Sequence, residues 1–252
     1  MRIREVYARS ILTRTNIPGI EYCLNPYVGC GHGCFYCYAT FMKKFAGHDD
    51  AWGTFVDVKV NATDLLKKAL RRGRQGEVIV SSVTDPYQPV EETYKLARAC
   101  LGLLTRSTLS ISILTKSDLV VRDIDLLRKA DNVEAGLTIT TDNEHTRKAF
   151  EPGSSGIKAR IAALRRIHEA GIPTYVFIGP ILPMNPERLV DSIAPFADSV
   201  LIDRMNYSWK VRQAYRARHL DYALEDAFFE EMESRLIRRL NKLGIQAKAV
   251  RP

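Results

Sequence analysis

The sequence lacks a long apolar stretch and has only a few, unpaired cysteines. No hydrophobic run in its 252 residues approaches the ~20 residues that a membrane-spanning helix needs, so we expect no membrane partner. The N-terminal stretch Met1–Glu5 has none of the apolar character of a secretory signal, so we expect a cytoplasmic location. The five cysteines cannot all pair, and no secretory context supports a disulfide framework.

The composition is that of a globular chain with a basic surface. Hydrophobic residues make up 46% of the chain, which is enough for a substantial core. The net charge of +8 favours anionic partners such as nucleic acid or phosphorylated metabolites, although a solubilising surface explains it equally well. No repeat and no linker divides the chain, so we expect one domain over 1–252. Its core is expected at about 20–203, and a C-terminal helical extension at 204–252.

Short apolar runs alternate with amphipathic segments along the chain. The runs rich in Val, Ile or Thr predict strands at Ile20–Leu24, Glu77–Ser82, Leu109–Thr115, Glu134–Thr140, Thr174–Ile178 and Ser199–Ile202. The helical patterns fall at Leu65–Arg72, Glu91–Thr105, Ile157–Ala170, from Asn185 onward, and at Tyr222–Leu243, before a last short strand at Gln246–Val250. This alternation predicts a parallel α/β fold.

Polar clusters follow most of the predicted strands. They are Ser81–Asp85, Thr115–Asp118, Thr138–Asp142, Gly179–Pro183 and Asp203–Asn206. Parallel sheets place ligand sites at the carboxyl ends of their strands, so all five clusters are expected to line one rim.

Three cysteines form the strongest chemical signal. Cys30, Cys34 and Cys37 have the spacing C-x3-C-x2-C, directly after the first predicted strand. Thiolates select zinc, copper(I) or iron–sulfur clusters, and three of them leave one iron of a four-iron cluster open. Zinc normally takes four ligands, so the alternative of a zinc site needs His32 or Cys23 as the fourth.

The cysteine loop resembles the cluster loop of the radical S-adenosylmethionine superfamily, including the aromatic residue at Tyr36. Later motifs are similar to those of its spore photoproduct lyase-like branch. They are Ser82–Glu91, Leu114–Ser117, Ile139–Asp142, Phe150–Pro152, Arg160–Leu164 and Ala170–Pro173. The resemblance spans about Tyr22 to Asp203.

The resemblance implies a partial (β/α)6 TIM-type barrel with a [4Fe–4S] cluster at its mouth. S-adenosylmethionine would bind the open iron, and an external flavodoxin- or ferredoxin-like reductant would supply one electron. Cleavage would give a 5′-deoxyadenosyl radical that abstracts hydrogen from the substrate.

The resemblance also implies roles for residues at the strand ends. Ser82 would hold the methionine amino group, and Lys116 would meet the carboxylate, a charge pairing that also makes physical sense. Thr138 or Thr140 would reach the ribose. Tyr36 and the backbone around Ile181 would flank adenine. Alternatively, Ser82 and Thr138 simply end strands, and Lys116 is solvated.

One departure from the branch bears on the substrate. Spore photoproduct lyases carry a hydrogen-donor cysteine just after the second strand, where this chain has Ser81 and Ser82. A hydroxyl O–H bond is too strong to return hydrogen to a carbon radical as a thiol does. We therefore expect a radical enzyme with an unidentified, anionic substrate, with photoproduct repair as the alternative.

A second hypothesis from a different class rests on the stretch Arg204–Arg218, which interleaves basic and aromatic residues. Such a pattern suits single-stranded nucleic acid, and it predicts a zinc-stabilised nucleic-acid-binding protein without catalysis. The competing interpretation, which we favour slightly, is an amphipathic helix whose aromatic residues pack and whose arginines are solvated.

Overall fold

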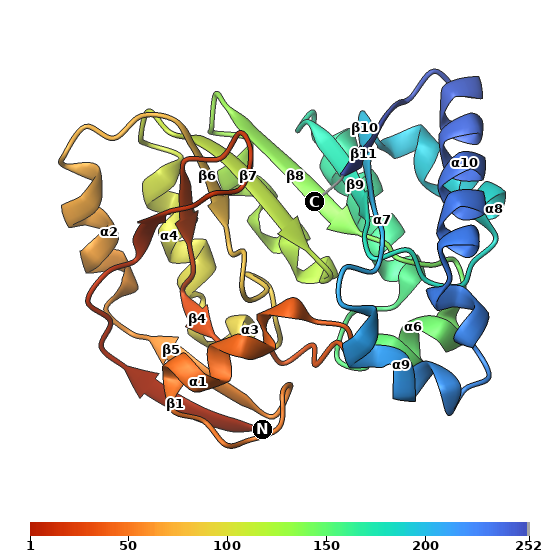
Figure 1. Cartoon of the computed structure of the whole chain (residues 1–252). Coiled ribbons are helices and arrows are strands. Elements are labelled where there is room, and N and C mark those ends of the chain that lie inside the picture. Colours follow the sequence, from red (N-terminus) through yellow and green to blue (C-terminus); the bar gives the residue numbers. More distant parts are fainter. Residues whose placement is uncertain (251–252) are drawn as a thin grey trace.

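The computed structural model describes residues 1–250 and contains a large and a small β-sheet (Figure 1). The large sheet has the order β11-β10-β9-β8-β7-β6-β3-β2, and the small one β1-β5-β4. The strands are β1 (Arg2–Val6), β2 (Leu12–Arg14), β3 (Tyr22–Leu24), β4 (Tyr27–Val28), β5 (Phe55–Lys59), β6 (Glu77–Val80), β7 (Ser110–Thr115), β8 (Val133–Thr138), β9 (Thr174–Ile178), β10 (Ser199–Asp203) and β11 (Gln246–Val250).

The large sheet confirms the predicted α/β class. All six predicted strands and the short C-terminal strand belong to it, and every neighbouring pair is parallel except β2 with β3. Its strand order runs from β2 to β11 without closing, as a partial barrel requires. The sequence interpretation missed β1, β2, β4 and β5, of which β1 and β2 have mostly exposed or half-buried residues.

Helices connect the strands and cover the large sheet. They are α1 (Met42–Ala46), α2 (Ala62–Leu70), α3 (Glu91–Tyr94), α4 (Leu96–Leu104), α5 (Ile124–Leu127), α6 (Glu144–Phe150), α7 (Ile157–Glu169), α8 (Pro186–Ile193), α9 (Ser208–Arg216) and α10 (Asp226–Lys242). The 3-10 turns are η1 (Tyr38–Phe41), η2 (Asp118–Asp123), η3 (Ala194–Phe196) and η4 (Asp221–Leu224). Among residues 1–250, no helix is both long and apolar enough to cross a membrane. The cytoplasmic location stays a prediction.

The predicted helix Glu91–Thr105 is wrong as one element, because the chain breaks at Lys95. This residue has a left-handed backbone with φ 51°, which separates α3 from α4. The buried carboxylate of Glu91 accepts hydrogen bonds from the amides of Ala97 (2.9 Å) and Arg98 (3.1 Å). A negative group at a helix N-terminus accepts hydrogen bonds from the free amides and interacts favourably with the helix dipole. The Glu91 carboxylate therefore caps α4 as a separate helix.

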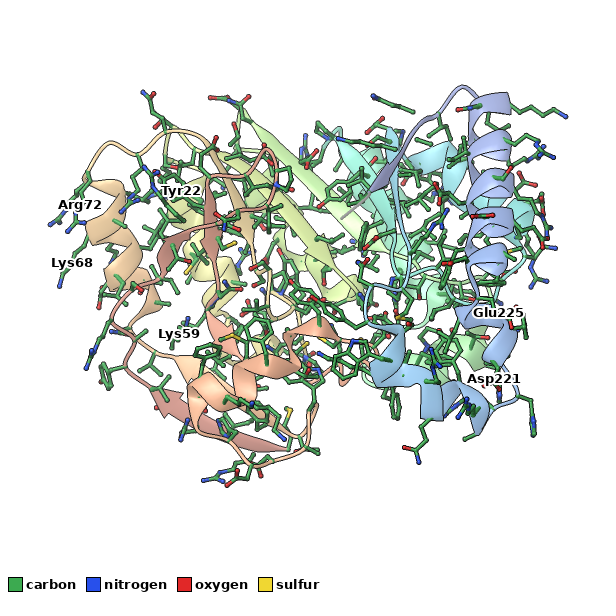
Figure 2. All side chains as sticks on the ribbon, viewed as in Figure 1. Tyr22, Lys59, Lys68, Arg72, Asp221 and Glu225 are labelled. Carbon is green, nitrogen blue, oxygen red and sulfur yellow. The ribbon has the colours of Figure 1, made fainter. Side chains whose placement is uncertain are left out.

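The predicted helix Tyr222–Leu243 also divides, at the extended residue Glu225. Its first residues form η4, and the remainder forms α10. In Figure 1, α10 lies beside α8, and the pairs Arg235–Glu187 and Arg239–Asp191 join the two helices, each at 2.6 Å. Figure 2 shows Asp221 near this end of the molecule, whereas Lys68 of α2 and Arg72, which follows α2, lie at the opposite end.

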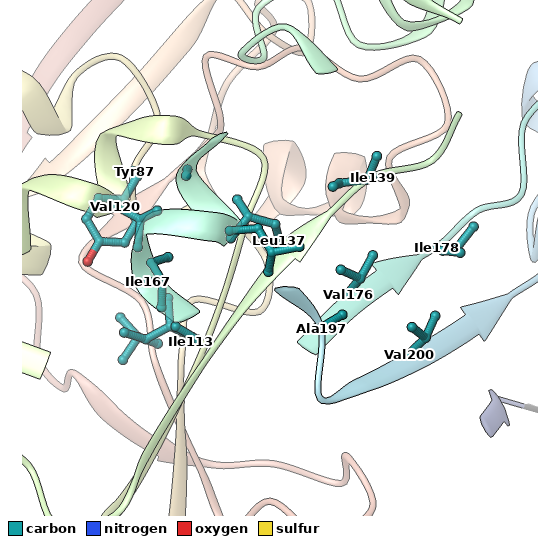
Figure 3. Close-up of a cluster of buried hydrophobic side chains, with 14 of the residues drawn as sticks. Tyr87, Ile113, Val120, Leu137, Ile139, Ile167, Val176, Ile178, Ala197 and Val200 are labelled. Atoms are coloured by element: carbon teal, nitrogen blue, oxygen red, sulfur yellow. The ribbon is translucent and has the colours of Figure 1, made fainter. Parts of the chain in front are cut away.

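The main core fills the space between the sheet and its helices (Figure 3). Side chains from the sheet, such as Ile113, Leu137 and Val176, are fully buried there. On α7, Leu164 and Ile167 are spaced three residues apart, so both face the sheet and are fully buried. This core holds the strands in register, and therefore holds their carboxyl ends at one rim.

Candidate metal and cofactor site

The cysteine loop lies between β4 and η1, so the short strand β4 separates it from β3, contrary to the prediction that it follows that strand directly. Two residues of the segment that follows β6 hold the cysteine loop in place. Thr84 donates to the Gly29 carbonyl, and Gln88 accepts from the Gly31 amide at 2.8 Å. Gly29 has φ 84°, and a Cβ there would lie 2.5 Å from the carbonyl oxygen of Phe55. The loop therefore needs glycine at this position to approach the small sheet.

A second segment, 150–153, holds the other side of the loop. The Phe35 amide donates to the Phe150 carbonyl at 3.0 Å, and the Gly153 amide donates to the His32 carbonyl at 2.9 Å. Both contacts join residues more than one hundred positions apart in the chain. The predicted motif Phe150–Pro152 is thus the partner of the cysteine loop.

The three thiols are free, with Cys30 and Cys34 buried and Cys37 half-buried. Burial raises the pKa of all three, and at Cys30 the charges of Asp85 and of the other two cysteines raise it further. All three lie within eight residues of one loop. They ligate metal only as thiolates, so metal binding must displace their protons.

His32 is turned to other partners than the thiols. Its Nδ1 lies 2.9 Å from the Gly153 carbonyl oxygen, and its Nε2 lies 3.2 Å from a carboxylate oxygen of Asp85. Within residues 1–250, no three His, Cys, Asp or Glu side chains converge on the position of one metal ion. A four-iron cluster binds its cysteines through different iron atoms and does not need that convergence. The zinc interpretation thus loses His32 as its fourth ligand.

Asp85 links the cysteine loop to the end of β7. It accepts from the Thr115 hydroxyl at 2.6 Å and from the amides of Lys116 (2.8 Å) and Tyr87 (2.9 Å). Burial alone would raise its pKa, but the charge of His32 and these hydrogen bonds outweigh burial and lower the pKa to about 2. Asp85 is therefore a fixed carboxylate that positions the backbone before Lys116.

Glu151 forms a second buried carboxylate centre beside the loop. It pairs with Arg160 at 2.5 Å, accepts from the Thr140 hydroxyl at 2.9 Å, and receives the hydroxyl of Tyr36. Burial would raise its pKa, but the charges of Arg160 and Lys116 and the hydrogen bonds lower it to about 2. The sequence interpretation quoted the motifs around Glu151 and Arg160 without assigning either a role.

Lys116 lies among these groups rather than in open solvent. Its ammonium lies 5.7 Å from the centroid of the Tyr36 ring. Its charge opposes the effect of burial on the pKa of Cys34 and Cys37. The ammonium therefore lies over the ring whose hydroxyl Glu151 binds, where it can pair with an anionic ligand group.

The end of β6 presents two serines with different environments. Ser81 has φ 71°, and its buried hydroxyl has no hydrogen-bond partner among residues 1–250. The amide of Ser82 donates to the side chain of Asn25 at 2.9 Å, and its carbonyl accepts from the hydroxyl of Tyr38. Ser82 is therefore joined to the residue that follows Cys37. A strained backbone and an unpaired hydroxyl often occur together at ligand sites.

The remaining predicted residues lie at the ends of β8 and β9. The hydroxyl of Thr140 already donates to Glu151, and the carbonyl of Thr138 accepts from Arg160 at 2.8 Å. The amide of Ile181 donates to the carbonyl of Asp203, and its side chain is fully buried. Of these three, Thr138 has a hydroxyl that makes no hydrogen bond with the described part of the chain.

The residues present fit an iron–sulfur cluster and an amino-acid-bearing nucleoside. Three thiols occupy one glycine-rich loop, Lys116 supplies a cation for a carboxylate, and the hydroxyls of Ser81 and Thr138 are free for polar contacts. Ser81, Lys116 and Thr138 lie at the carboxyl ends of parallel strands, where ligands bind in this kind of sheet, and the cysteine loop is fastened to the segment after one of them, β6.

Comparison with known families gives a match over most of the chain. The family described as the radical SAM superfamily matches residues 24–194. An uncharacterised protein of Methanocaldococcus jannaschii is 38% identical over 208 residues, which cover 82% of this chain and 78% of that protein. An uncharacterised protein of Mycobacterium tuberculosis is 32% identical over 179 residues, 68% of this chain, and the match covers 52% of its length.

Comparison with solved structures gives the same fold. A mutant of spore photoproduct lyase with bound AdoMet and dinucleoside spore photoproduct superposes with a TM-score of 0.71. The superposition covers 98% of this chain and 81% of the lyase at 18% identity. At that identity, the likeness establishes the fold alone.

Proposed function

Because this chain belongs to the radical S-adenosylmethionine (radical SAM) superfamily, we propose that Cys30, Cys34 and Cys37 hold the [4Fe–4S] cluster that enzymes of this superfamily use. When bound, the reduced cluster transfers one electron to S-adenosylmethionine, which gives methionine and a 5′-deoxyadenosyl radical that abstracts hydrogen from a substrate. The observation that carries the proposal is the three thiols on one loop at the rim of a parallel sheet.

The proposed cofactor contacts follow from charge and hydrogen-bonding capacity. Lys116 binds the carboxylate of S-adenosylmethionine, because its ammonium lies over the ring of Tyr36, the residue next to Cys37. Ser82 binds the amino group at the end of β6. Thr138 is the better contact for the ribose, because the hydroxyl of Thr140 is engaged by Glu151. Tyr36 and the backbone around Ile181 flank adenine.

Glu151 and Asp85 act in this proposal by positioning rather than by chemistry. Glu151 holds the Tyr36 hydroxyl, so the ring beneath Lys116 is fixed. Asp85 binds the Lys116 amide and the Thr115 hydroxyl, so the backbone from which Lys116 extends is fixed too. Fixed contacts cost less ordering when the cofactor binds, which favours a reproducible geometry.

The residues of the site do not identify the substrate or the reductant. Enzymes of this superfamily need an electron donor, and we expect a flavodoxin- or ferredoxin-like one here. We expect an anionic substrate because of the basic net charge. Photoproduct repair is the weaker candidate, because Ser81 and Ser82 offer hydroxyls where that chemistry needs a thiol.

The test is to replace Cys34 with alanine. Reconstituted wild type should show the broad visible absorption of a thiolate-ligated cluster and, after reduction, form 5′-deoxyadenosine from S-adenosylmethionine. Cys34→Ala should lose both, because a cluster ligand is gone. Cys100→Ala, which removes a thiol buried in α4, is the matched control and should keep both. Stoichiometric zinc without iron after anaerobic purification would contradict the proposal.

A further inference from the structure

Two segments beside the cysteine loop expose aromatic rings and carry charge of one sign. Residues 38–47 and 207–220 contain no Asp or Glu but six basic residues, namely Lys43, Lys44, Lys210, Arg212, Arg216 and Arg218. Four of their aromatic residues are strongly exposed, namely Phe41 (44%), Phe45 (80%), Tyr207 (41%) and Trp209 (70%). We call these two segments together the basic aromatic face.

The two segments adjoin each other and the metal site. Lys210 donates to the hydroxyl of Thr40 at 3.4 Å, which joins the start of α9 to η1. Thr40 lies only three positions after Cys37, so this contact brings the start of α9 close to the cysteine loop. Tyr38 follows Cys37 directly and begins the face. A molecule bound here would lie against the mouth of the site.

The aromatic rings of the face are presented to solvent rather than packed. The buried side of α9 is made by Val211 and Tyr215, which are 1% and 0% exposed. Tyr207, which precedes α9, and Trp209 are exposed, with the Lys210 ammonium 4.8 Å and 5.4 Å from their ring centroids. The favoured expectation that the aromatic residues of this stretch pack inside is therefore right for Tyr215 and wrong for Trp209.

Exposed rings interleaved with cations match one ligand chemistry well. Bases of an unpaired strand offer π-faces that stack on aromatic side chains, and its phosphates offer the negative charge that Lys and Arg neutralise. A duplex fits the face less well, because its bases stack on one another and cannot stack on the exposed rings. An acidic protein surface would meet the basic residues, but it has no need of the aromatic rings. Clusters of exposed aromatic residues are unusual on a surface that binds nothing.

We propose that the basic aromatic face binds single-stranded nucleic acid, and that the enzyme acts on a nucleotide of the bound strand. The inference that the face binds a strand rests on the surface alone. The inference that the enzyme acts on a nucleotide of that strand rests also on the proposed radical SAM activity. A strand stacked on Trp209 and Phe45 would pass the cysteine loop, because Lys210 contacts Thr40, three residues after Cys37.

The experiment measures binding of a fluorescent single strand of about 10 nucleotides, a length within the range one such site covers. The variants are Trp209→Ala and Lys210→Ala in the reconstituted full chain. Lys68→Ala is the matched charge control, because it lies on α2 at the far end of the molecule (Figure 2). Quenching of tryptophan fluorescence by the strand in wild type, and its loss in Trp209→Ala, gives a second readout that does not depend on activity.

Wild type should bind with an affinity that falls as salt rises. Trp209→Ala should bind about 5- to 100-fold more weakly, the range expected for one lost stacking contact. Lys210→Ala should reduce the slope of log affinity against log salt by about 0.7, the value for one phosphate contact on a single strand. Lys68→Ala should bind as wild type does.

Three outcomes would overturn the inference. The first is that wild type does not bind the strand at low salt. The second is that Trp209→Ala binds the strand as tightly as wild type does. The third is that Trp209→Ala and Lys210→Ala keep their strand binding but are reduced more slowly by an acidic flavoprotein. The last would assign the face to the reductant. Cleavage of S-adenosylmethionine by wild type without any strand tests the proposed function separately, so a failure of either can be told from a failure of the other.

Discussion

Glu151 and Arg160 form an ion pair with both side chains fully buried. Burying two charges costs several kcal/mol per ion, and only close geometry with further hydrogen bonds offsets that cost. Tyr36, Thr140 and the carbonyl of Thr138 supply those bonds. The centre therefore ties the cysteine loop, β8 and α7 into one arrangement at the level of single residues.

Replacing Glu151 by glutamine should destabilise the protein strongly. The change leaves the Arg160 charge buried and uncompensated, so the free energy of unfolding should fall by about 3–5 kcal/mol. The matched control is Glu231→Gln, whose carboxylate pairs with Arg235 but is 62% exposed, and it should cost less than about 1 kcal/mol. Urea denaturation at neutral pH gives both values.

The pH dependence of the same variant provides an internal check. The pKa of Glu151 is about 2 in the folded chain against an ordinary value of 4.5, so its stabilisation is complete above pH 4.5 and is lost as pH falls toward 2. Glutamine cannot titrate. The difference in unfolding free energy between wild type and Glu151→Gln should therefore shrink in this window, and a constant difference would contradict the assigned pKa.

At the scale of elements, α4 depends on a cap that comes from outside its own sequence. The Glu91 carboxylate belongs to α3 and reaches the first amides of α4 because Lys95 turns the chain in a left-handed conformation. A side chain with a Cβ is strained there, and glycine is the residue that adopts it without cost. The buried carboxylate of Glu91 thus sets the break at Lys95, although the local helix propensity favours one continuous helix.

Replacing Lys95 by glycine should raise the free energy of unfolding by about 0.5–1 kcal/mol, since it relieves a left-handed backbone at an exposed position. Thr105→Gly is the matched control, because Thr105 ends α4 with an ordinary right-handed backbone. It should lower stability by up to about 1 kcal/mol. Destabilisation by Lys95→Gly of the same size as the control would show that the backbone is not strained. Both values come from chemical denaturation.

At the scale of the whole molecule, the metal loop is seated between the two sheets. Gly53, in the connection before β5 of the small sheet, touches Gly33 of the cysteine loop, and a Cβ at Gly53 would lie 2.7 Å from the Cα of Gly33. The small sheet therefore forms part of the wall against which the cluster loop closes. The contact between Gly53 and Gly33 joins residues twenty positions apart, so it forms only when the chain is folded.

Replacing Gly53 by alanine should lower the iron content of the reconstituted protein, because the new methyl group displaces the cysteine loop. Gly73→Ala is the matched control: both glycines have positive φ, 92° and 62°, but a Cβ at Gly73 meets no atom within 4 Å. Both variants should lose about 1–2 kcal/mol of stability through backbone strain. Equal iron content in the two variants would show that the contact at Gly33 is not required.

Much of the sheet and the loop of three cysteines could be predicted from local patterns. The strand Thr174–Ile178 was predicted to the residue, because a run of buried apolar side chains needs no long-range information. The cysteine spacing likewise identifies its chemistry within eight residues. The small sheet could not be predicted, because its strand β1, with alternating charges, pairs with a segment some fifty residues away.

The sequence by itself determined the parallel α/β class, the three thiols and the family, because periodicity and ligand spacing are local properties. The tertiary structure alone decided that Glu151 meets Tyr36, that Glu91 starts α4, and that Trp209 stays in solvent. The physical reason is that buried charges and exposed rings acquire their roles from partners distant in the chain. Only the closed core brings those partners together.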